Sequence, residues 1–251
     1  MSIWIYTDAD NTLWDTNAVF AEAQLALLNL AEDLSGVHHP INSRVEFVRE
    51  VDQAIAARHH ARLRYPPALL LRALRERLGG LSPEAAAQRV LAQGSVPTES
   101  ETTGLCAYSR ILSRVPPLLP GVRDGLELAS KQGMPVYVIT EGPIELVRTR
   151  LQRLELAALT TGALSAAKTP GLFARLKQRA APHSALMIGD QPDRDIRFAH
   201  EAGLKTILVI GSFRPRWAQL AETDLADSMV DNFLDAIKQA IQWNALSQCN
   251  H

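Results

Sequence analysis

Three short apolar runs, each followed at once by polar or acidic residues, constrain the fold of this chain more than any other feature. The runs cover residues 3–6, 135–139 and 185–188, and a fourth apolar run covers 206–210. Continuous apolar runs of this length predict buried strands of a parallel sheet. Helices are expected over residues 121–132, 143–154, 194–202 and 232–243. Strands and helices that alternate in this way predict an α/β fold with a doubly wound parallel sheet.

Residues 16–117 are expected to form a helical insertion, because they contain no convincing strand and are rich in Ala, Leu and Arg at helical spacing. Phe20, Leu27, Leu30 and Leu34 are predicted to share a buried stripe. Ser82 before Pro83 is typical of a helix start. The predicted domains are therefore a core of residues 1–15 and 118–251 and a helical unit of residues 16–117.

Composition predicts a soluble, cytoplasmic protein. The net charge of −1 gives no electrostatic reason to expect binding to nucleic acid or to a membrane surface. No run approaches the roughly 18 apolar residues of a membrane helix, and no signal peptide is visible. The two cysteines lack metal-type spacing, and a disulfide framework is not expected.

The polar residues after three of these strands are expected to meet in space. Asp8 and Asp10 follow the first run, Thr140 the second, and Asp190 and Asp195 the third. In an open α/β sheet, reactive groups gather beyond the carboxyl ends of the strands. Clustered carboxylates repel one another unless a cation lies among them, and their oxygens suit Mg²⁺. The pattern therefore predicts a magnesium site in which one carboxylate can attack phosphorus.

The order of these motifs resembles the haloacid dehalogenase (HAD) superfamily. The matching features are Asp-x-Asp-x-Thr at residues 8–12, a strand ending in Thr140, then Lys168, then Gly189-Asp190 with Asp195 five residues later. The resemblance covers residues 1–15 and about 118–251. It implies a Rossmann-like core, with residues 16–117 inserted after the first motif as an all-helical cap of the superfamily's first type.

The resemblance implies a role for each matching residue. Asp8 would be the nucleophile that forms an aspartyl-phosphate, and Asp10 would act as general acid and then as general base. The Asp8 carboxylate, the Asp10 backbone carbonyl and Asp190 would hold Mg²⁺. Thr140 and the backbone N–H of Glu141 would bind phosphoryl oxygens.

Two further roles follow from the resemblance, each with an alternative. Lys168 would offset the charge of nucleophile and phosphate, but no proline follows it directly, and Lys177 is the second candidate. Asp195 would orient the waters of the metal or Lys168, and Asp193 lies close enough in sequence to replace it.

The predicted cap contains a basic segment that could bind a second anionic group of the substrate. Arg58, Arg62 and Arg64 begin a stretch, ending at Arg77, that holds six arginines and one glutamate, a net charge of +5 (six minus one). The alternative is a solvated helix face, which is the more common reason for a run of charge.

The predicted function is magnesium-dependent hydrolysis of a small phosphate monoester. The dehalogenase branch of the superfamily lacks the second aspartate, whereas Asp10 is present here. A phosphonatase needs a cap lysine, and the first lysine of this chain is Lys131. A phosphomutase of the same fold and a catalytically inactive binding module are the alternatives, and a small phosphorylated metabolite is the expected partner.

Overall fold

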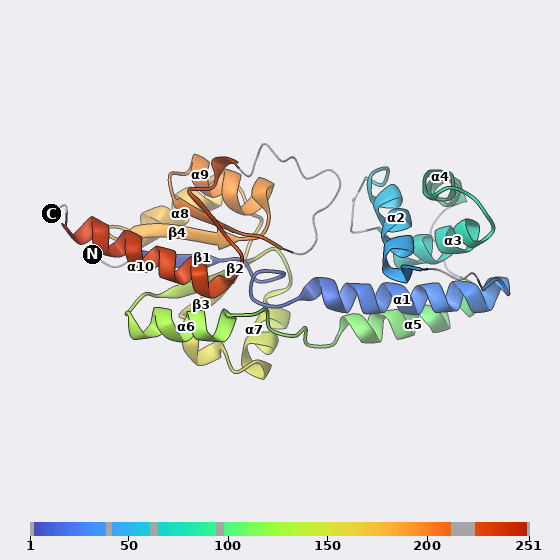
Figure 1. The fold of residues 1–251 in the computed structure, drawn as a ribbon, viewed down its shortest axis with the longest axis horizontal. Helices are drawn as coiled ribbons and strands as arrows, with labels where there is room; N and C mark the ends of the chain where they lie inside the picture. Colours follow the sequence, from blue (N-terminus) through green and yellow to red (C-terminus); the bar gives the residue numbers. More distant parts are fainter. Residues whose placement is uncertain (1–2, 39–41, 61–64, 94–97, 212–223, 250–251) are drawn as a thin grey trace. The chain divides into compact units, whose positions relative to one another are not determined.

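The structure, a computed structural model, describes residues 3–38, 42–60, 65–93, 98–211 and 224–249. They form two compact units (Figure 1). Each unit has its own hydrophobic core. One unit contains the described residues of 3–16, 115–211 and 224–249, and the other contains those of 17–114.

The first unit is built on a six-stranded parallel sheet in the order β3-β2-β1-β4-β5-β6. The strands are β1 (Ile3–Thr7), β2 (Val136–Thr140), β3 (Gly162–Ser165), β4 (Ser184–Gly189), β5 (Lys205–Val209) and β6 (Ser228–Val230). The parallel α/β sheet and the four predicted strands are confirmed. The edge strands β3 and β6 were not predicted, because they are short and largely unburied and so carry no continuous apolar run.

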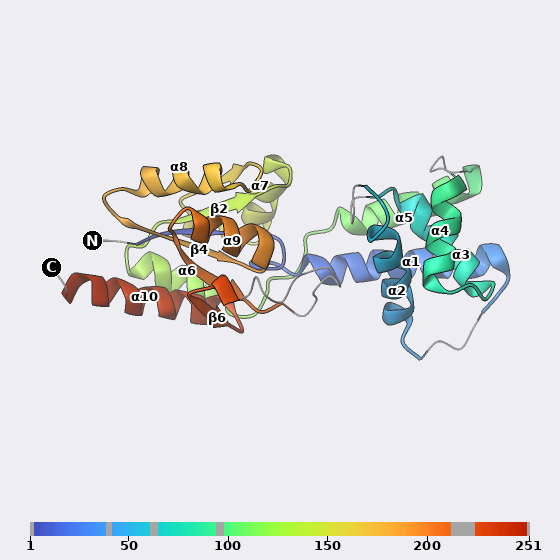
Figure 2. The ribbon, with the colours of Figure 1, turned by 90° about the horizontal axis from the view of Figure 1, so that it is seen from above.

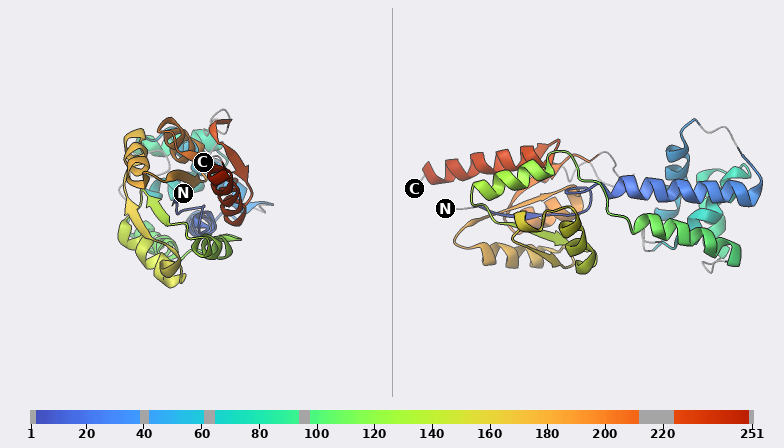
Figure 3. Two further views of the ribbon diagram at one scale, coloured as in Figure 1. Left: turned by 90° about the vertical axis from the view of Figure 1, so that its left-hand side faces the viewer. Right: turned by 90° about the horizontal axis from the view of Figure 1, so that it is seen from below.

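Helices cover both faces of this sheet. On one face α6 (Val122–Lys131) and α10 (Phe233–Cys249) run side by side, as Figure 3 shows. On the other face lie α8 (Pro170–Ala180) and α9 (Arg197–Glu201), so that α8 and α10 flank the sheet from opposite sides (Figure 2). The apolar side chains between these layers form the buried core of the unit.

Strand β1 lies at the centre of the sheet and sets the position of the site. Thr7 is level with Val138 of β2 and with Ile188 of β4. The residues that follow these three strands therefore emerge at one edge, the carboxyl edge of the sheet.

The second unit is entirely helical in its described residues and is inserted between β1 and β2. Its helices are α1 (Thr16–Ser35), α2 (Arg44–Ala56), α3 (Pro67–Leu78), α4 (Pro83–Gln93) and α5 (Glu99–Leu112). The predicted start of α4 is confirmed, since Ser82 Oγ accepts a hydrogen bond from the N–H of Ala85. The predicted stripe on α1 is wrong at Phe20, which is 40% exposed, whereas Leu27 is fully buried. No described helix of either unit is long and apolar enough to cross a membrane.

A buried ion pair joins α3 to the start of α5. Arg72 donates two hydrogen bonds to Glu101, from Nε at 2.9 Å and from Nη2 at 2.8 Å. The same carboxylate accepts the N–H of Thr98 at 2.8 Å, which completes a capping box at the amino end of α5. The pKa of Glu101 is lowered to about 2, and the hydrogen bonds from Arg72 are the largest cause.

We expect Glu101→Gln to lower the free energy of unfolding by about 2–3 kcal/mol at pH 7, because Arg72 then loses the charge of the Glu101 carboxylate. The pKa of Glu101 is lower in the folded chain than its usual value of 4.5, so the ionised carboxylate stabilises the fold above about pH 4.5. This contribution is lost as the pH falls toward 2. Urea unfolding of both proteins between pH 7 and pH 3 measures the difference, which should shrink with acid.

Glu99→Gln is the matched control, because Glu99 is an exposed acid in the first turn of the same helix. Only a few tenths of a kcal/mol are expected from its interaction with the helix dipole. Equal losses for the two variants would show that the buried pair adds nothing beyond this dipole effect.

Candidate active site

Asp8 is the first residue after β1 and lies deep in the carboxyl edge of the sheet. Its N–H donates to the carbonyl of Ile188 at 2.9 Å, so the backbone is still held by β4 at this point. The side chain is buried, and Lys168 Nζ donates to Oδ1. The second oxygen, Oδ2, is buried and has no hydrogen-bond partner in the described structure.

Asp190 directly follows β4 and brings a second carboxylate to the same place. One oxygen each from Asp8, Asp190 and Asp195 lies within 4.8 Å of the others. Oδ1 of Asp190 is buried and, like Oδ2 of Asp8, has no hydrogen-bond partner among the described residues. Each of these two clustered carboxylates therefore keeps one buried oxygen that is unsatisfied among the described residues.

Asp195 belongs to this cluster but has both oxygens engaged. It lies fully buried in a single π-helical turn, Pro192–Ile196. Oδ1 accepts from Lys168 Nζ at 2.5 Å, and Oδ2 accepts from the N–H of Gln191 at 3.1 Å. A Cβ added to Gly189 would lie 2.3 Å from Asp195 Oδ2, which explains why a glycine precedes Asp190. Asp195 thus supports Lys168, and the free oxygens belong to Asp8 and Asp190.

The cluster holds more carboxylate charge than Lys168 alone can balance. The pKa of Asp8 is raised to about 7, mainly by burial, with Lys168 lowering it and Asp195 and Asp10 adding smaller raising effects. Burial and the neighbouring Asp8 and Asp195 likewise raise the pKa of Asp190 well above its usual value. Carboxylates held this close need additional positive charge to ionise together. A hard divalent cation bound by the free oxygens of Asp8 and Asp190 fits this need, and Mg²⁺ fits such a donor set.

Lys168 is the cation that the structure already places in the cluster. It follows β3 and is buried between Asp8 and Asp195. Burial lowers the pKa of Lys168, but the carboxylates of Asp195 and Asp8 outweigh this effect and hold it well above the usual range. The alternative residues lie elsewhere, since Lys177 on α8 and Asp193 are both exposed to solvent.

Thr140 and Glu141 follow β2 at the same edge. The hydroxyl oxygen of Thr140 accepts the N–H of Gly142 at 2.9 Å, so it closes the turn that leads into α7 (Ile144–Arg153). The Glu141 carboxylate accepts the N–H of Lys168 at 3.0 Å and forms an ion pair with Arg194. The Glu141 side chain therefore holds the segment that carries Lys168 in place. Phosphate binding by Thr140 and the Glu141 N–H stays a prediction.

Asp10 has contacts that the sequence did not suggest. Its Oδ1 accepts from Trp14 Nε1 at 2.8 Å, from Thr16 Oγ1 at 2.6 Å and from Arg150 Nη1 at 2.9 Å. Arg150 lies on α7, about 140 residues away in sequence, and its side chain is only 7% exposed. No pattern marked it, because Arg148 and Arg153 on the same helix look equivalent in the sequence and are both exposed.

The arginines predicted to bind substrate from the helical unit are only partly covered by the structure. Arg58 lies just after α2 and donates to the carbonyl of Ala54 in that helix at 3.0 Å. Arg62 and Arg64 lie outside the described residues. Contact between these arginines and a substrate therefore stays a prediction.

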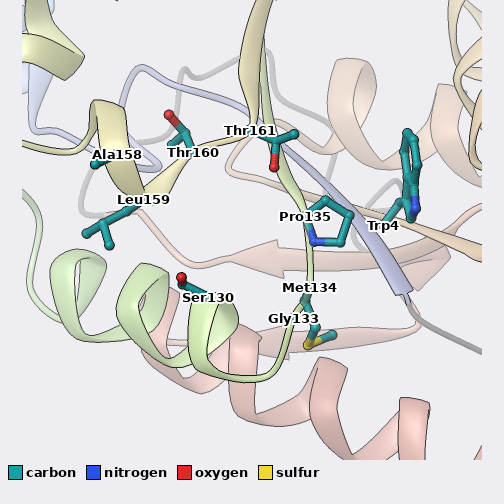
Figure 4. A pocket seen from close by; sticks show the side chains of 9 residues that line it. All are labelled: Trp4, Ser130, Gly133, Met134, Pro135, Ala158, Leu159, Thr160 and Thr161. Carbon is teal, nitrogen blue, oxygen red and sulfur yellow. The ribbon is translucent and has the colours of Figure 1, made fainter.

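A groove of the first unit lies away from the carboxylate cluster. Residues from the starts of β1, β2 and β3 line it, including Trp4, Pro135 and Thr161, and Figure 4 shows these side chains around the opening. Its walls carry no charged side chain. The groove is therefore at the amino edge of the sheet, whereas the acidic cluster is at the carboxyl edge.

Two comparisons with known sequences give matches over part of the chain. A sequence model of the HAD-hydrolase-like family matches residues 162–236. A phosphoserine phosphatase of Thermus thermophilus is 33% identical over 107 residues, which are 39% of this chain and 43% of that protein. The match thus spans less than half the length of this relative.

Solved structures share the fold across nearly the whole chain. A haloacid dehalogenase-like family hydrolase from Xanthomonas campestris is 15% identical, with a TM-score of 0.61 over 99% of this chain and 98% of that chain. A Bacillus subtilis protein described as a HAD-hydrolase, bound to magnesium, is 15% identical, with a TM-score of 0.58 over 95% and 98%. A Haemophilus somnus protein assigned as a phosphoglycolate phosphatase is 19% identical, with a TM-score of 0.58 over 94% and 96%. At these identities the likeness establishes the fold.

Proposed function

Since the chain belongs to the HAD-like hydrolase superfamily, we propose that it is a magnesium-dependent phosphatase that hydrolyses a small phosphate monoester through an aspartyl-phosphate on Asp8. The observation that carries the proposal is the state of the Asp8 carboxylate. Lys168 binds one oxygen, and the other is buried without a partner in a cluster that also holds an unpartnered oxygen of Asp190. The phosphoserine and phosphoglycolate phosphatases among the similar proteins support phosphoryl chemistry on a small metabolite.

In the first step Asp8 acts as the nucleophile. A carboxylate oxygen of Asp8 forms a bond to phosphorus, and the bond from phosphorus to the ester oxygen breaks. Asp10 gives its proton to the departing oxygen, which leaves as an alcohol. Lys168 offsets the charge of the nucleophile and the phosphoryl group, and Asp195 holds Lys168 in place.

In the second step water releases the phosphate. Asp10, now a carboxylate, takes a proton from a water molecule whose oxygen bonds to phosphorus, and the bond from Asp8 to phosphorus breaks. Asp8 and Asp10 thereby return to their starting protonation states. Bound by Asp8, Asp190 and the Asp10 carbonyl, Mg²⁺ would neutralise charge on the attacking carboxylate and the phosphoryl oxygens.

Removing the metal is expected to lower phosphate release by about 10³-fold, since charge stabilisation by a metal contributes several kcal/mol. The measurement is phosphate release from a panel of esters that includes phosphoserine, phosphoglycolate, sugar phosphates and nucleoside monophosphates. Each ester is assayed with MgCl₂, with chelator, and after MgCl₂ is added back in excess. Equal release in chelator would contradict the metal requirement, and no release from any ester would contradict the phosphatase assignment.

A further inference from the structure

Arg150 is a buried cation that the proposed chemistry does not use. Its side chain is 7% exposed, and its guanidinium carbon lies 5.7 Å from the centre of the Trp14 ring. Among the described residues its one ion-pair partner is Asp10, and its Nε is buried without a hydrogen bond. Burying a guanidinium is costly unless it is paired, so this placement needs a compensating interaction.

That interaction fixes one side of the Asp10 carboxylate. Oδ1 accepts hydrogen bonds from three side chains, those of Arg150, Trp14 and Thr16. None of the described residues donates a hydrogen bond to Oδ2. Three donors on one oxygen restrict rotation of the carboxylate and leave the other oxygen as the atom available for proton transfer.

Orientation of this kind has a large effect on proton transfer. A catalytic acid must lie within hydrogen-bond reach of the atom that it protonates, and a displacement of 1 Å can cost about 100-fold in rate. Trp14 and Thr16 lie close to Asp10 in sequence and move with its loop. Arg150 comes from α7 and joins that loop to a different part of the core.

We propose that Arg150 is a positioning residue for Asp10. Its hydrogen bond from α7 holds the carboxyl group of the general acid in the orientation that protonates the departing oxygen. The inference rests on the proposed function, because it assigns Arg150 to the acid step of that reaction. Arg150 itself is proposed to touch neither the substrate nor the phosphoryl group.

Two aryl phosphates of nearly equal size separate this role from a structural one. Phenyl phosphate releases a phenoxide about as basic as tyrosinate, with a pKa of about 10, so its departure depends on a proton from Asp10. The para-nitrophenyl ester releases a much less basic oxygen and needs that proton far less. The value of kcat/KM reports on steps through the first bond cleavage, so the ratio between the two esters isolates the acid step.

Arg150→Met is expected to lower kcat/KM for phenyl phosphate by about 100-fold and for para-nitrophenyl phosphate by less than tenfold. Thr16→Val removes a different donor from the same Oδ1. This variant tests the positioning of Asp10 even if Arg150→Met folds poorly. It should shift the ratio in the same direction by a smaller factor. Arg148→Met is the matched control, because Arg148 lies on the exposed side of the same helix and pairs with Glu145.

The outcomes separate this inference from the function on which it rests. A native protein that hydrolyses neither aryl ester and no ester of the metabolite panel overturns both. An active native protein whose Arg150→Met and Thr16→Val variants lose the same factor on both esters overturns the positioning role alone. A rise in rate for Arg150→Met would also overturn it, because Arg150 would then hold Asp10 away from its working position.

Discussion

Replacing Asp8 with asparagine is expected to lower magnesium-dependent phosphate release by about 10⁴-fold or more, which is the scale seen when a catalytic nucleophile is removed. Asparagine has nearly the shape of Asp8 but cannot form the acyl-phosphate bond. It also offers no charge to Lys168 or to a bound cation. The measurement is kcat for the preferred ester, with thermal unfolding of both proteins to show that the variant is folded.

Asp193→Asn supplies the control for this experiment. Asp193 is an exposed carboxylate in the segment after β4, so the change removes the same charge a short distance from the buried cluster. Activity within about twofold of the native protein is expected, because surface substitutions rarely disturb a site. If Asp8→Asn kept activity comparable to this control, Asp8 would not be the nucleophile.

Lys168→Met is expected to have two large effects. Activity should fall by about 10³-fold, the cost of losing a preorganised charge next to a developing phosphoryl anion. The folded state should also lose about 3–5 kcal/mol in the presence of chelator, because Asp8 and Asp195 then remain buried without their cation. Mg²⁺ should return part of that stability by supplying positive charge to Asp8 and Asp190.

Lys177→Met is the matched variant, because Lys177 is an exposed lysine on α8 and was the second candidate in the sequence. It should change neither kcat nor the free energy of unfolding by a measurable amount. Urea unfolding with and without Mg²⁺ gives the stability difference, and the ester assay gives the rate. A Lys168→Met protein as stable as Lys177→Met in chelator would show that the buried triad does not depend on its cation.

The carboxylate cluster was predictable from the sequence because parallel strands impose a shared edge. Asp8 and Asp190 follow β1 and β4, which are neighbours in the sheet, and their apolar runs are visible without a structure. Lys168 could be named only through the order of the motifs. Its segment follows β3, a four-residue edge strand that carries no apolar run.

The network around Asp10 could not be predicted in the same way. Arg150 is one of several arginines on α7, and burial of this one depends on how that helix packs against the loop that carries Trp14. The outward turn of Phe20 likewise depends on which face of α1 packs against the other helices. Periodicity shows that a helix has an apolar stripe but not where that stripe ends.

Trapping the phosphorylated enzyme identifies the carboxylate that carries the phosphoryl group. The protein is mixed with its preferred ester and Mg²⁺, quenched, and reduced with borohydride, which converts an aspartyl-phosphate into homoserine. Peptide mass spectrometry then locates the modified residue. Homoserine is expected at position 8 in the native protein and nowhere in the Asp8→Asn protein. Turnover without any modification at position 8, or modification at another carboxylate, would contradict the assignment of Asp8 as the nucleophile.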